Sequence, residues 1–240
     1  MMQVRKAADR GVAEHGWLSS RHTFSFAGYR DPGQIGFSDL RVINEDRVQP
    51  GQGFGTHPHQ DMEIFSYVLE GALAHSDSMG TGSVIKPGDV QLMSAGTGVT
   101  HSEFNGSDDA LVHFLQIWIV PAKTGGKPVY QQRRFDATEK RGRLRVIISP
   151  DGHDDSLRIQ QDASVYAGLF DGEESTTLLL PTNRHAYVHV VRGSIELNGE
   201  RIHAGDGVRL RHPEKLEFKA GDDAEVLVID LRPEELPQLP

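Results

Sequence analysis

The sequence predicts an all-β fold, built as a β-sandwich or barrel. Three observations lead to this prediction: the apolar runs are short, they often alternate with polar residues, and Gly, Pro, Asp and Asn separate them. The chain has 240 residues, of which 26 are glycine. That length suits two small units or one large one, and the glycine content favours many tight turns.

The predicted elements follow in chain order. Strands are expected at residues 63–69, 90–93, 112–120, 143–148, 177–180, 187–191, 194–197, 207–210 and 224–231. Asn198-Gly199 predicts a two-residue hairpin turn, because both positions of such a turn favour a positive φ. Residues 135–141 are expected to form one short helix with Asp136 as its N-cap. The tail at 233–240 is expected to be coil.

Composition argues against several classes of protein. The formal net charge is −9, so the chain has no general attraction to phosphate backbones or anionic lipid, and nucleic-acid binding is not expected. It contains no cysteine, which excludes disulfides and cysteine-ligated metal sites and fits the cytoplasm, the expected location. Neither a secretory signal nor an apolar run of ~18 residues is found, so no membrane partner is expected.

Similar patterns in the two halves predict an internal duplication. Residues 68–71 end at a glycine and precede Gly88-Asp89, and residues 191–193 end at a glycine and precede Gly205-Asp206. Each pattern reads as strand, glycine turn, strand and Gly-Asp turn. We therefore expect an N-terminal domain at residues 1–125 and a C-terminal domain at 126–240. A coincidence between two β-rich halves is the alternative.

Two pairs of polar residues indicate a metal site. His57 and His59 stand on either side of Pro58, and His101 and Glu103 have the same spacing in a second glycine-flanked segment. Side chains two apart lie on one face of a strand, so each pair presents two ligand groups to one point. Proline cannot donate to a strand ladder, so the segment with Pro58 is expected at a sheet edge.

If these two strands are neighbours, three imidazoles and one carboxylate meet. Such a set suits Fe(II), Mn(II), Ni(II) or Zn(II) better than Ca(II) or Mg(II). Four protein ligands on an octahedral ion leave two positions open, as a chelating substrate, or a substrate together with O₂, requires. A structural role for each lone histidine is the alternative, and the coincidence of the two pairs favours the metal site.

The other histidines are expected to be structural or exposed. They are His15, His22, His75, His113, His153, His185, His189, His203 and His212. His185 and His189 share a strand face but are separated by about 13 Å at roughly 3.3 Å per residue, which is too far for one ion. Five aromatic residues are candidates to line a pocket: Trp17, Phe24, Phe26, Phe54 and Trp118. For Phe24, Phe26 and Trp118, a place in the core is the favoured expectation.

Residues 51–71 are similar to the first cupin motif, with a Gly, five residues, His-x-His, three residues, Glu and a later Gly. The last gap has seven residues where six are usual. His101 and Asn105 match the end of the second cupin motif, although Gly96 stands where a Pro is expected. The chain resembles the pirin family of bicupins, and within it the bacterial pirin-like quercetin 2,3-dioxygenases. This resemblance implies two β-barrel or jelly-roll cupin domains packed in tandem. The supporting segments are residues 16–18, 22–26, 36–37, 40–44, 56–59, 95–98, 101–103, 116–118 and 130–135.

The resemblance implies one divalent transition metal per chain, bound by His57, His59, His101 and Glu103. Iron is the usual metal, with Zn, Mn, Ni or Cu as other candidates. It further implies that the chain cleaves the heterocycle of flavonols such as quercetin with O₂ and releases carbon monoxide. The metal would act as a Lewis acid on the 3-hydroxyl and 4-carbonyl oxygens. Glu103 would be the catalytic residue that takes the hydroxyl proton.

Other functions stay open at this point. Some pirins are iron-dependent regulators that bind a protein partner, and the same ligands would then hold a redox-sensing iron. A metal-dependent sugar isomerase is a lesser alternative, since no basic residue near the motif supports phosphate binding. Glu63 is expected either to orient a ligand histidine or to be a structural polar residue.

The second half is expected to be a degenerate cupin domain without metal ligands. When the glycines of the two patterns are aligned, Leu179 and Pro181 stand where His57 and His59 stand in the first half. In the same way, Phe218 and Ala220 stand at the positions of His101 and Glu103. We therefore expect this half to pack against the first rather than to form a second active site.

Overall fold

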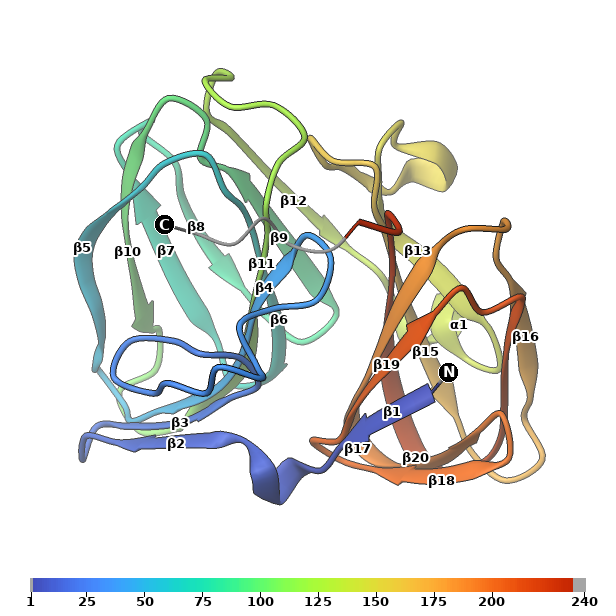
Figure 1. Ribbon diagram of the computed structural model, residues 1–240. Helices are drawn as coiled ribbons and strands as arrows, with labels where there is room; N and C mark the ends of the chain where they lie inside the picture. Colours follow the sequence, from blue (N-terminus) through green and yellow to red (C-terminus); the bar gives the residue numbers. More distant parts are fainter. Residues whose placement is uncertain (1, 235–240) are drawn as a thin grey trace.

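The computed structural model describes residues 2–234, and nearly all of its regular structure is β-strand (Figure 1). Two β-units lie side by side, the N-terminal one in blue to green and the C-terminal one in yellow to red. The predicted all-β architecture of two units is confirmed. Within the described residues, no helix is both long enough and apolar enough to cross a membrane.

The N-terminal unit consists of two sheets. The larger sheet has the strand order β12-β9-β6-β11-β4-β3-β2, and the smaller has the order β5-β10-β7-β8. The strands of the larger sheet are β2 (Gly11–Glu14), β3 (Leu18–His22), β4 (Leu40–Val48), β6 (Glu63–Glu70), β9 (Asp89–Ser94), β11 (Val112–Ile119) and β12 (Val129–Arg134). Those of the smaller sheet are β5 (Gly53–His59), β7 (Leu73–Asp77), β8 (Gly82–Ile85) and β10 (Val99–Asn105).

The C-terminal unit is one sheet of nine strands with the main order β1-β19-β17-β20-β15-β13-β14. Its strands are β1 (Met2–Arg5), β13 (Leu144–Ser149), β14 (Leu157–Arg158), β15 (Ser164–Phe170), β16 (Thr176–Leu179), β17 (His185–Leu197), β18 (Glu200–His203), β19 (Gly207–Arg211) and β20 (Lys215–Leu231). Short helical segments complete the chain at Ala7–Asp9, at α1 (Ala137–Lys140) and at His153–Asp155.

In the C-terminal half, the predicted hairpin turn is confirmed, but one pair of predicted strands is a single strand. Asn198 and Gly199 have φ values of 47° and 86° and join β17 to β18 as predicted. Two strands were expected on either side of Gly193, but β17 runs through it with shifts of register. A Cβ on Gly193 would lie 2.2 Å from the carbonyl oxygen of Asp222. The glycine therefore permits a close approach of two strands rather than a turn.

The other local predictions concern the helix and the tail. The helix forms over Ala137–Lys140, with Asp136 as its N-cap, and the backbone N–H of Asp136 donates to Glu139 Oε1 at 2.9 Å. It is shorter than the expected 135–141. Most of the tail that was predicted as coil, residues 235–240, lies outside the described residues.

Two strands cross between the units. β1, at the start of the chain, pairs with β19 of the C-terminal sheet, and β12 pairs with β9 of the N-terminal sheet. After β1 the chain passes into the N-terminal unit, and after β12 it passes into the C-terminal unit. The two strands therefore lie where the chain crosses from one unit to the other. The division at residues 125 and 126 stays a prediction.

The larger N-terminal sheet has two different faces because side chains alternate along its strands. Phe65 and Tyr67 of β6 pack in a core that also contains Leu227 and Ile229 of the C-terminal unit. Ser66, between them in sequence, points the opposite way and donates to Glu103 of the smaller sheet. One face of this sheet therefore joins the two units, and the other faces the interior of the N-terminal unit.

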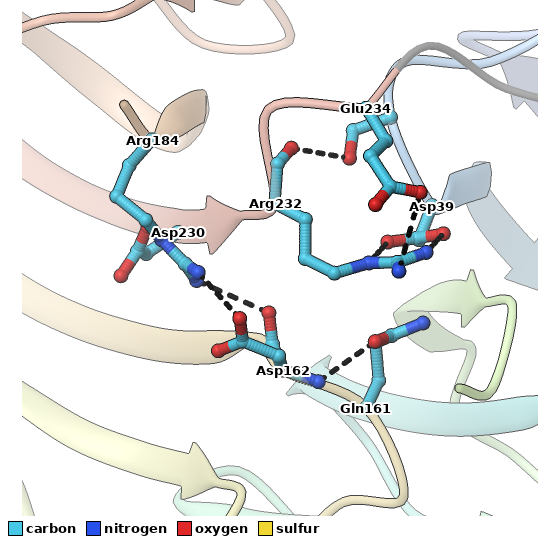
Figure 2. Close-up of polar contacts among 8 residues, drawn as sticks. Asp39, Gln161, Asp162, Arg184, Asp230, Arg232 and Glu234 are labelled. Atoms are coloured by element: carbon cyan, nitrogen blue, oxygen red, sulfur yellow. Dashed lines mark hydrogen bonds and ion pairs between the residues drawn. The ribbon is translucent and has the colours of Figure 1, made fainter. Parts of the chain in front are cut away.

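An ion pair ties the end of β20 to the N-terminal unit (Figure 2). The guanidinium of Arg232 donates to both carboxylate oxygens of Asp39, at 2.8 and 2.7 Å. The backbone carbonyl of Arg232 accepts from Ser38 Oγ at 2.7 Å. Glu234 contacts the same guanidinium at 3.2 Å. Arg184 and Asp230 form a second pair nearby at 2.8 Å. A two-point pair of this kind fixes orientation as well as distance.

Close contact between β5 and β10 depends on a glycine. A Cβ on Gly53 would lie 2.3 Å from the carbonyl oxygen of Glu103 and 2.5 Å from Cα of Phe104. Both atoms belong to the backbone, so they cannot move aside as a flexible side chain would. Gly55, two residues along the same strand, has open space at its Cβ position. Only the first glycine is therefore required by packing.

We predict that Asp39→Ala lowers the free energy of unfolding by about 1–3 kcal/mol, because a partly buried, two-point ion pair is lost. Urea denaturation measures this change. Glu234→Ala is the matched control, since Glu234 contacts the same guanidinium but is 64% exposed, and exposed pairs contribute about 0–1 kcal/mol. Equal losses in the two variants would show that Asp39 does not hold the units together.

We predict that Gly53→Ala destabilises the chain by about 1–3 kcal/mol, because the added methyl group overpacks a backbone contact. Gly55→Ala should change stability by less than about 0.5 kcal/mol, as for an open surface site. Thermal and urea unfolding of the two variants test the difference. A Gly53 variant as stable as the Gly55 variant would contradict the required close approach.

Candidate metal centre

The two predicted ligand pairs lie on neighbouring strands. β5 pairs with β10 in an antiparallel register that places His57 opposite His101. β5 is the edge strand of its sheet, as the proline between His57 and His59 predicted. Because side chains two apart share a face, His59 turns to the same side as His57. The metal site predicted from the sequence requires that the two strands be neighbours, and they are.

The three imidazoles converge on a common point. Nitrogens of His57, His59 and His101 all lie within 4.8 Å of one another, and the Nε2 atoms of His57 and His101 are 3.0 Å apart. Metal–nitrogen bonds of about 2.1 Å at right angles would separate two ligand nitrogens by about 3.0 Å. The spacing therefore fits two neighbouring ligands of one ion.

A hydrogen bond orients the imidazole of His57 so that its Nε2 faces the candidate centre. His57 Nδ1 is 2.8 Å from the carbonyl oxygen of Gly55, and because a carbonyl only accepts, Nδ1 carries the proton. The lone pair of His57 is then on Nε2, which faces His101. His101 Nδ1 is buried and has no hydrogen-bond partner among the described residues. Fixing one ring nitrogen by a backbone carbonyl is a common way to orient a metal-binding histidine.

Burial favours the neutral form of His59 and of His101. Burial, together with the neighbouring His57, lowers the pKa of His59 to about 4. Burial, followed by the nearby imidazoles of His59 and His57, lowers the pKa of His101 to about 3. A histidine binds a metal only in its neutral form. At neutral pH the ligand lone pairs are therefore available without the release of a proton.

Glu103 lies deeper than the histidines and is almost fully buried, at 1% exposure. Its carboxylate accepts from Ser66 Oγ at 3.2 Å and from Gln116 Nε2 at 2.8 Å. Burial raises the pKa of Glu103 to about 7, the hydrogen bond from Ser66 opposes this, and the nearby Asp46 adds to it. The four-ligand set that includes Glu103 stays a prediction.

His75 was expected to be structural, but it lies beside the candidate centre. β7 pairs with β10 so that His75 stands opposite Glu103, and His75, His101 and Glu103 form a second group of ligand atoms within 4.8 Å. Its Nε2 contacts Asp77 at 3.0 Å, and its Nδ1 has no partner among the described residues. The only sequence signal was the His-x-Asp spacing of residues 75 and 77.

Glu63 points away from the centre. It alternates with Ile64 and Ser66 along β6, so it faces the C-terminal unit. Its carboxylate accepts from Ser94 Oγ at 2.8 Å and from the backbone N–H of Gln160 at 3.2 Å. Of the two expectations for Glu63, the structural polar residue is the one that fits.

A cavity of about 980 Å³ opens beside His57 and His59. Its aromatic wall includes Trp17 and Phe54, as expected, but also Phe26 and Trp118, which were expected in the core. The Trp118 ring lies edge-on to His59, with 4.9 Å between centroids. Phe24 is buried in the core between the two units, as expected. The candidate centre thus adjoins a space that suits a flat aromatic molecule.

The histidines of the C-terminal half have a different environment. His185 stacks on Phe37 with 5.3 Å between ring centroids, and His212 meets it edge-on at 4.8 Å. His189 is also buried. Within residues 2–234, both groups of three close ligand atoms belong to the N-terminal unit.

Comparison with known proteins gives the same architecture. A family model described as Pirin matches residues 2–119, and one described as Quercetinase C-terminal cupin domain matches residues 146–231. The crystal structure of YhhW from Escherichia coli superposes with a TM-score of 0.94 at 45% identity, covering 99% of this chain and 100% of that one. The structure of the bacterial pirin YhhW in complex with nickel(II) gives 0.93 at 44% identity, covering 98% and 100%.

Curated relatives extend over nearly the whole chain. The quercetin 2,3-dioxygenase of Escherichia coli strain K12 is 46% identical over 233 residues, which are 97% of this chain and 100% of that protein. A pirin-like protein of Caulobacter vibrioides is 39% identical over 94% of this chain and 98% of its own length. Similarity of this extent confirms the resemblance seen in the sequence, and the chain belongs to the pirin family of bicupins.

Proposed function

We propose that this protein is a metal-dependent dioxygenase that cleaves the heterocycle of a flavonol such as quercetin with O₂ and releases carbon monoxide. The observation that carries the proposal is the convergence of three imidazoles beside an aromatic cavity, which His57 and His59 line. Relatives with 46% identity are named quercetin 2,3-dioxygenases. A cytoplasmic site of action is part of the proposal.

His57, His59 and His101 would hold the metal, with Glu103 as the fourth ligand. Nitrogen and carboxylate oxygen together suit a first-row divalent ion, and a structure of a relative contains nickel(II). For this chain we propose Fe(II). When bound, the ion supplies a Lewis acid that lowers the pKa of the flavonol 3-hydroxyl.

The protein's own residues prepare the site for that chemistry. The Gly55 carbonyl fixes the ring of His57, and the aromatic side chains of Phe54 and Trp118 exclude water from a flat substrate. Ser66 and Gln116 hold the carboxylate of Glu103 in one orientation. Glu103 is the group that we assign to accept the proton of the 3-hydroxyl, because a positioned carboxylate acts as a general base.

An iron-dependent regulator that binds a protein partner would use the same ligands. The cavity distinguishes the two functions, because a redox sensor needs no space for an aromatic substrate, whereas a flavonol dioxygenase does. Oxygen uptake with quercetin, together with detection of carbon monoxide, tests the proposed activity directly. Metal-loaded protein that leaves quercetin unchanged in air would overturn it.

We predict that adding Fe(II) under argon to metal-free protein raises its Tm, because an ion that binds only the folded chain stabilises it. The gain is about 2.7 kcal/mol at a metal concentration of 100 times Kd. His57→Ala should abolish this shift, while the exposed His203→Ala control should retain it. A full shift in the His57 variant, measured by thermal unfolding, would remove His57 from the ligand set.

We predict that Glu103→Gln lowers kcat for quercetin by about 10²–10⁴-fold, the usual contribution of a general base. Glu63→Gln is the matched control, because Glu63 is equally buried in the same unit but faces the other side of the sheet. Steady-state oxygen uptake gives kcat, and metal content must be measured in both variants. An active Glu103 variant with normal metal content would contradict its catalytic role.

A further inference from the structure

A row of polar side chains crosses the interior face of the larger N-terminal sheet. Its members are successive cross-strand partners on β9, β6, β11, β4 and β3, namely Gln91, Ser66, Gln116, Asn44 and His22. All five are buried, with 8% exposure at most. The neighbouring row on the same face is apolar and consists of Met93, Ile64, Trp118 and Val42. A buried polar row of this length requires partners.

The middle of this polar row is already occupied. Ser66 and Gln116 donate to the two oxygens of Glu103. Both ends of the row hold buried atoms without a hydrogen-bond partner among the described residues: Nε2 and Oε1 of Gln91 on β9, and Asn44 Oδ1 and His22 Nδ1 on β4 and β3. Of these residues, Asn44 and His22 line a cavity. An unpaired buried polar atom of this kind destabilises the fold, because it has lost its hydrogen bonds to water and gained none in return. A molecule that supplied hydrogen bonds here would therefore gain affinity.

Asp46 lies next to Asn44, beside the end of the row on β4 and β3. It lies two residues beyond Asn44 on the same face of β4, is 3% exposed, and accepts from Ser20 Oγ across to β3. A carboxylate oxygen has room for more than one donor. Asn44 and Asp46 therefore present acceptor oxygens side by side, and O–H or N–H donors are the groups that match them.

These acceptors line the same cavity as the candidate metal centre. Asn44, Asp46, His57 and His59 all belong to the wall of the space of about 980 Å³. The histidines come from β5 of the smaller sheet, and the acceptors come from β4 of the larger sheet. The cavity is therefore polar on two walls, with aromatic side chains such as Trp118 and Phe54 among the residues that line it.

Resting on the proposed function, we propose that Asn44 and Asp46 accept hydrogen bonds from phenolic hydroxyls of the flavonol other than its 3-hydroxyl. They thereby determine which hydroxylation patterns the site accepts. A flavonol without those hydroxyls would leave Asn44 Oδ1 buried and unpaired and would leave Asp46 with the bond from Ser20 Oγ. Sites built around such hydrogen bonds reject the analogue that lacks them much more strongly than apolar pockets distinguish sizes.

The test measures binding apart from turnover. Both tryptophans of the chain, Trp17 and Trp118, line the cavity, so quenching of their fluorescence reports occupancy of metal-loaded protein under argon. Three probes distinguish the hydroxyls concerned: quercetin, galangin without hydroxyls on the pendant ring, and fisetin, which keeps those hydroxyls but lacks the 5-hydroxyl beside the 4-carbonyl. We expect the wild-type chain to bind quercetin about tenfold more tightly than at least one of the other two.

Asn44→Leu should remove most of this discrimination by weakening quercetin about tenfold while changing the rejected flavonol less than twofold. Asp46→Leu removes both carboxylate oxygens and should act in the same direction. Gln91→Leu is the matched control: Gln91 is 1% exposed and belongs to the same row, but it is outside the set of residues that line the cavity. It should leave the discrimination intact.

Three results would decide against the assignment. Equal weakening of all three flavonols in the Asn44 and Asp46 variants would show a structural role, and unchanged binding would show that water alone occupies the acceptors. Discrimination absent from the wild-type chain would also overturn it. Selective binding that the variants abolish, in a protein that does not consume O₂, would instead uphold the recognition site and refute the proposed dioxygenase activity.

Discussion

The register between β5 and β10 is the constraint on which the candidate centre depends. A shift of one residue would turn every side chain of β5 to the opposite face, and His57 would then leave the interior while Pro58 entered it. The close approach at Gly53 holds this register from one end, because β5 there passes within contact of the Glu103 backbone. The proposed metal ligation therefore depends on strand pairing rather than on a local loop geometry.

The same interior that aligns the ligands also sets their charge. A neutral imidazole is what burial favours for His59 and His101, and a neutral acid is what it favours for Glu103. Among the described residues, several buried nitrogens have no hydrogen-bond partner, including Nδ1 of His75 and of His101. An ion at the three imidazoles would be held by Nε2 of His57 and Nε2 of His101, which lie 3.0 Å apart.

The sequence predicted those parts of the site whose residues form a pattern along a single strand. The His57–His59 and His101–Glu103 pairs were found because a spacing of two is visible along one strand. His75 was missed because its relation to Glu103 exists only across β7 and β10. Trp118 was assigned to the core because an apolar side chain that lines a cavity has the same sequence pattern as one that fills a core. The polar row is formed by one residue from each of five strands, so it appears only once the registers are known.

The second unit explains how the larger sheet can carry polar groups on its inner face. Adjacent residues of β4 point in opposite directions: Asp46 faces the cavity, while Glu45 binds Arg10 at 2.7 Å and His113 at 2.9 Å. On that outer face, Phe65 and Tyr67 share a core with the C-terminal sheet. A sheet whose inner face is partly polar must bury its other face to be stable. The C-terminal unit supplies that burial and so supports the sheet that lines the cavity. Within residues 2–234, its own strands contribute no residue to either group of close ligand atoms.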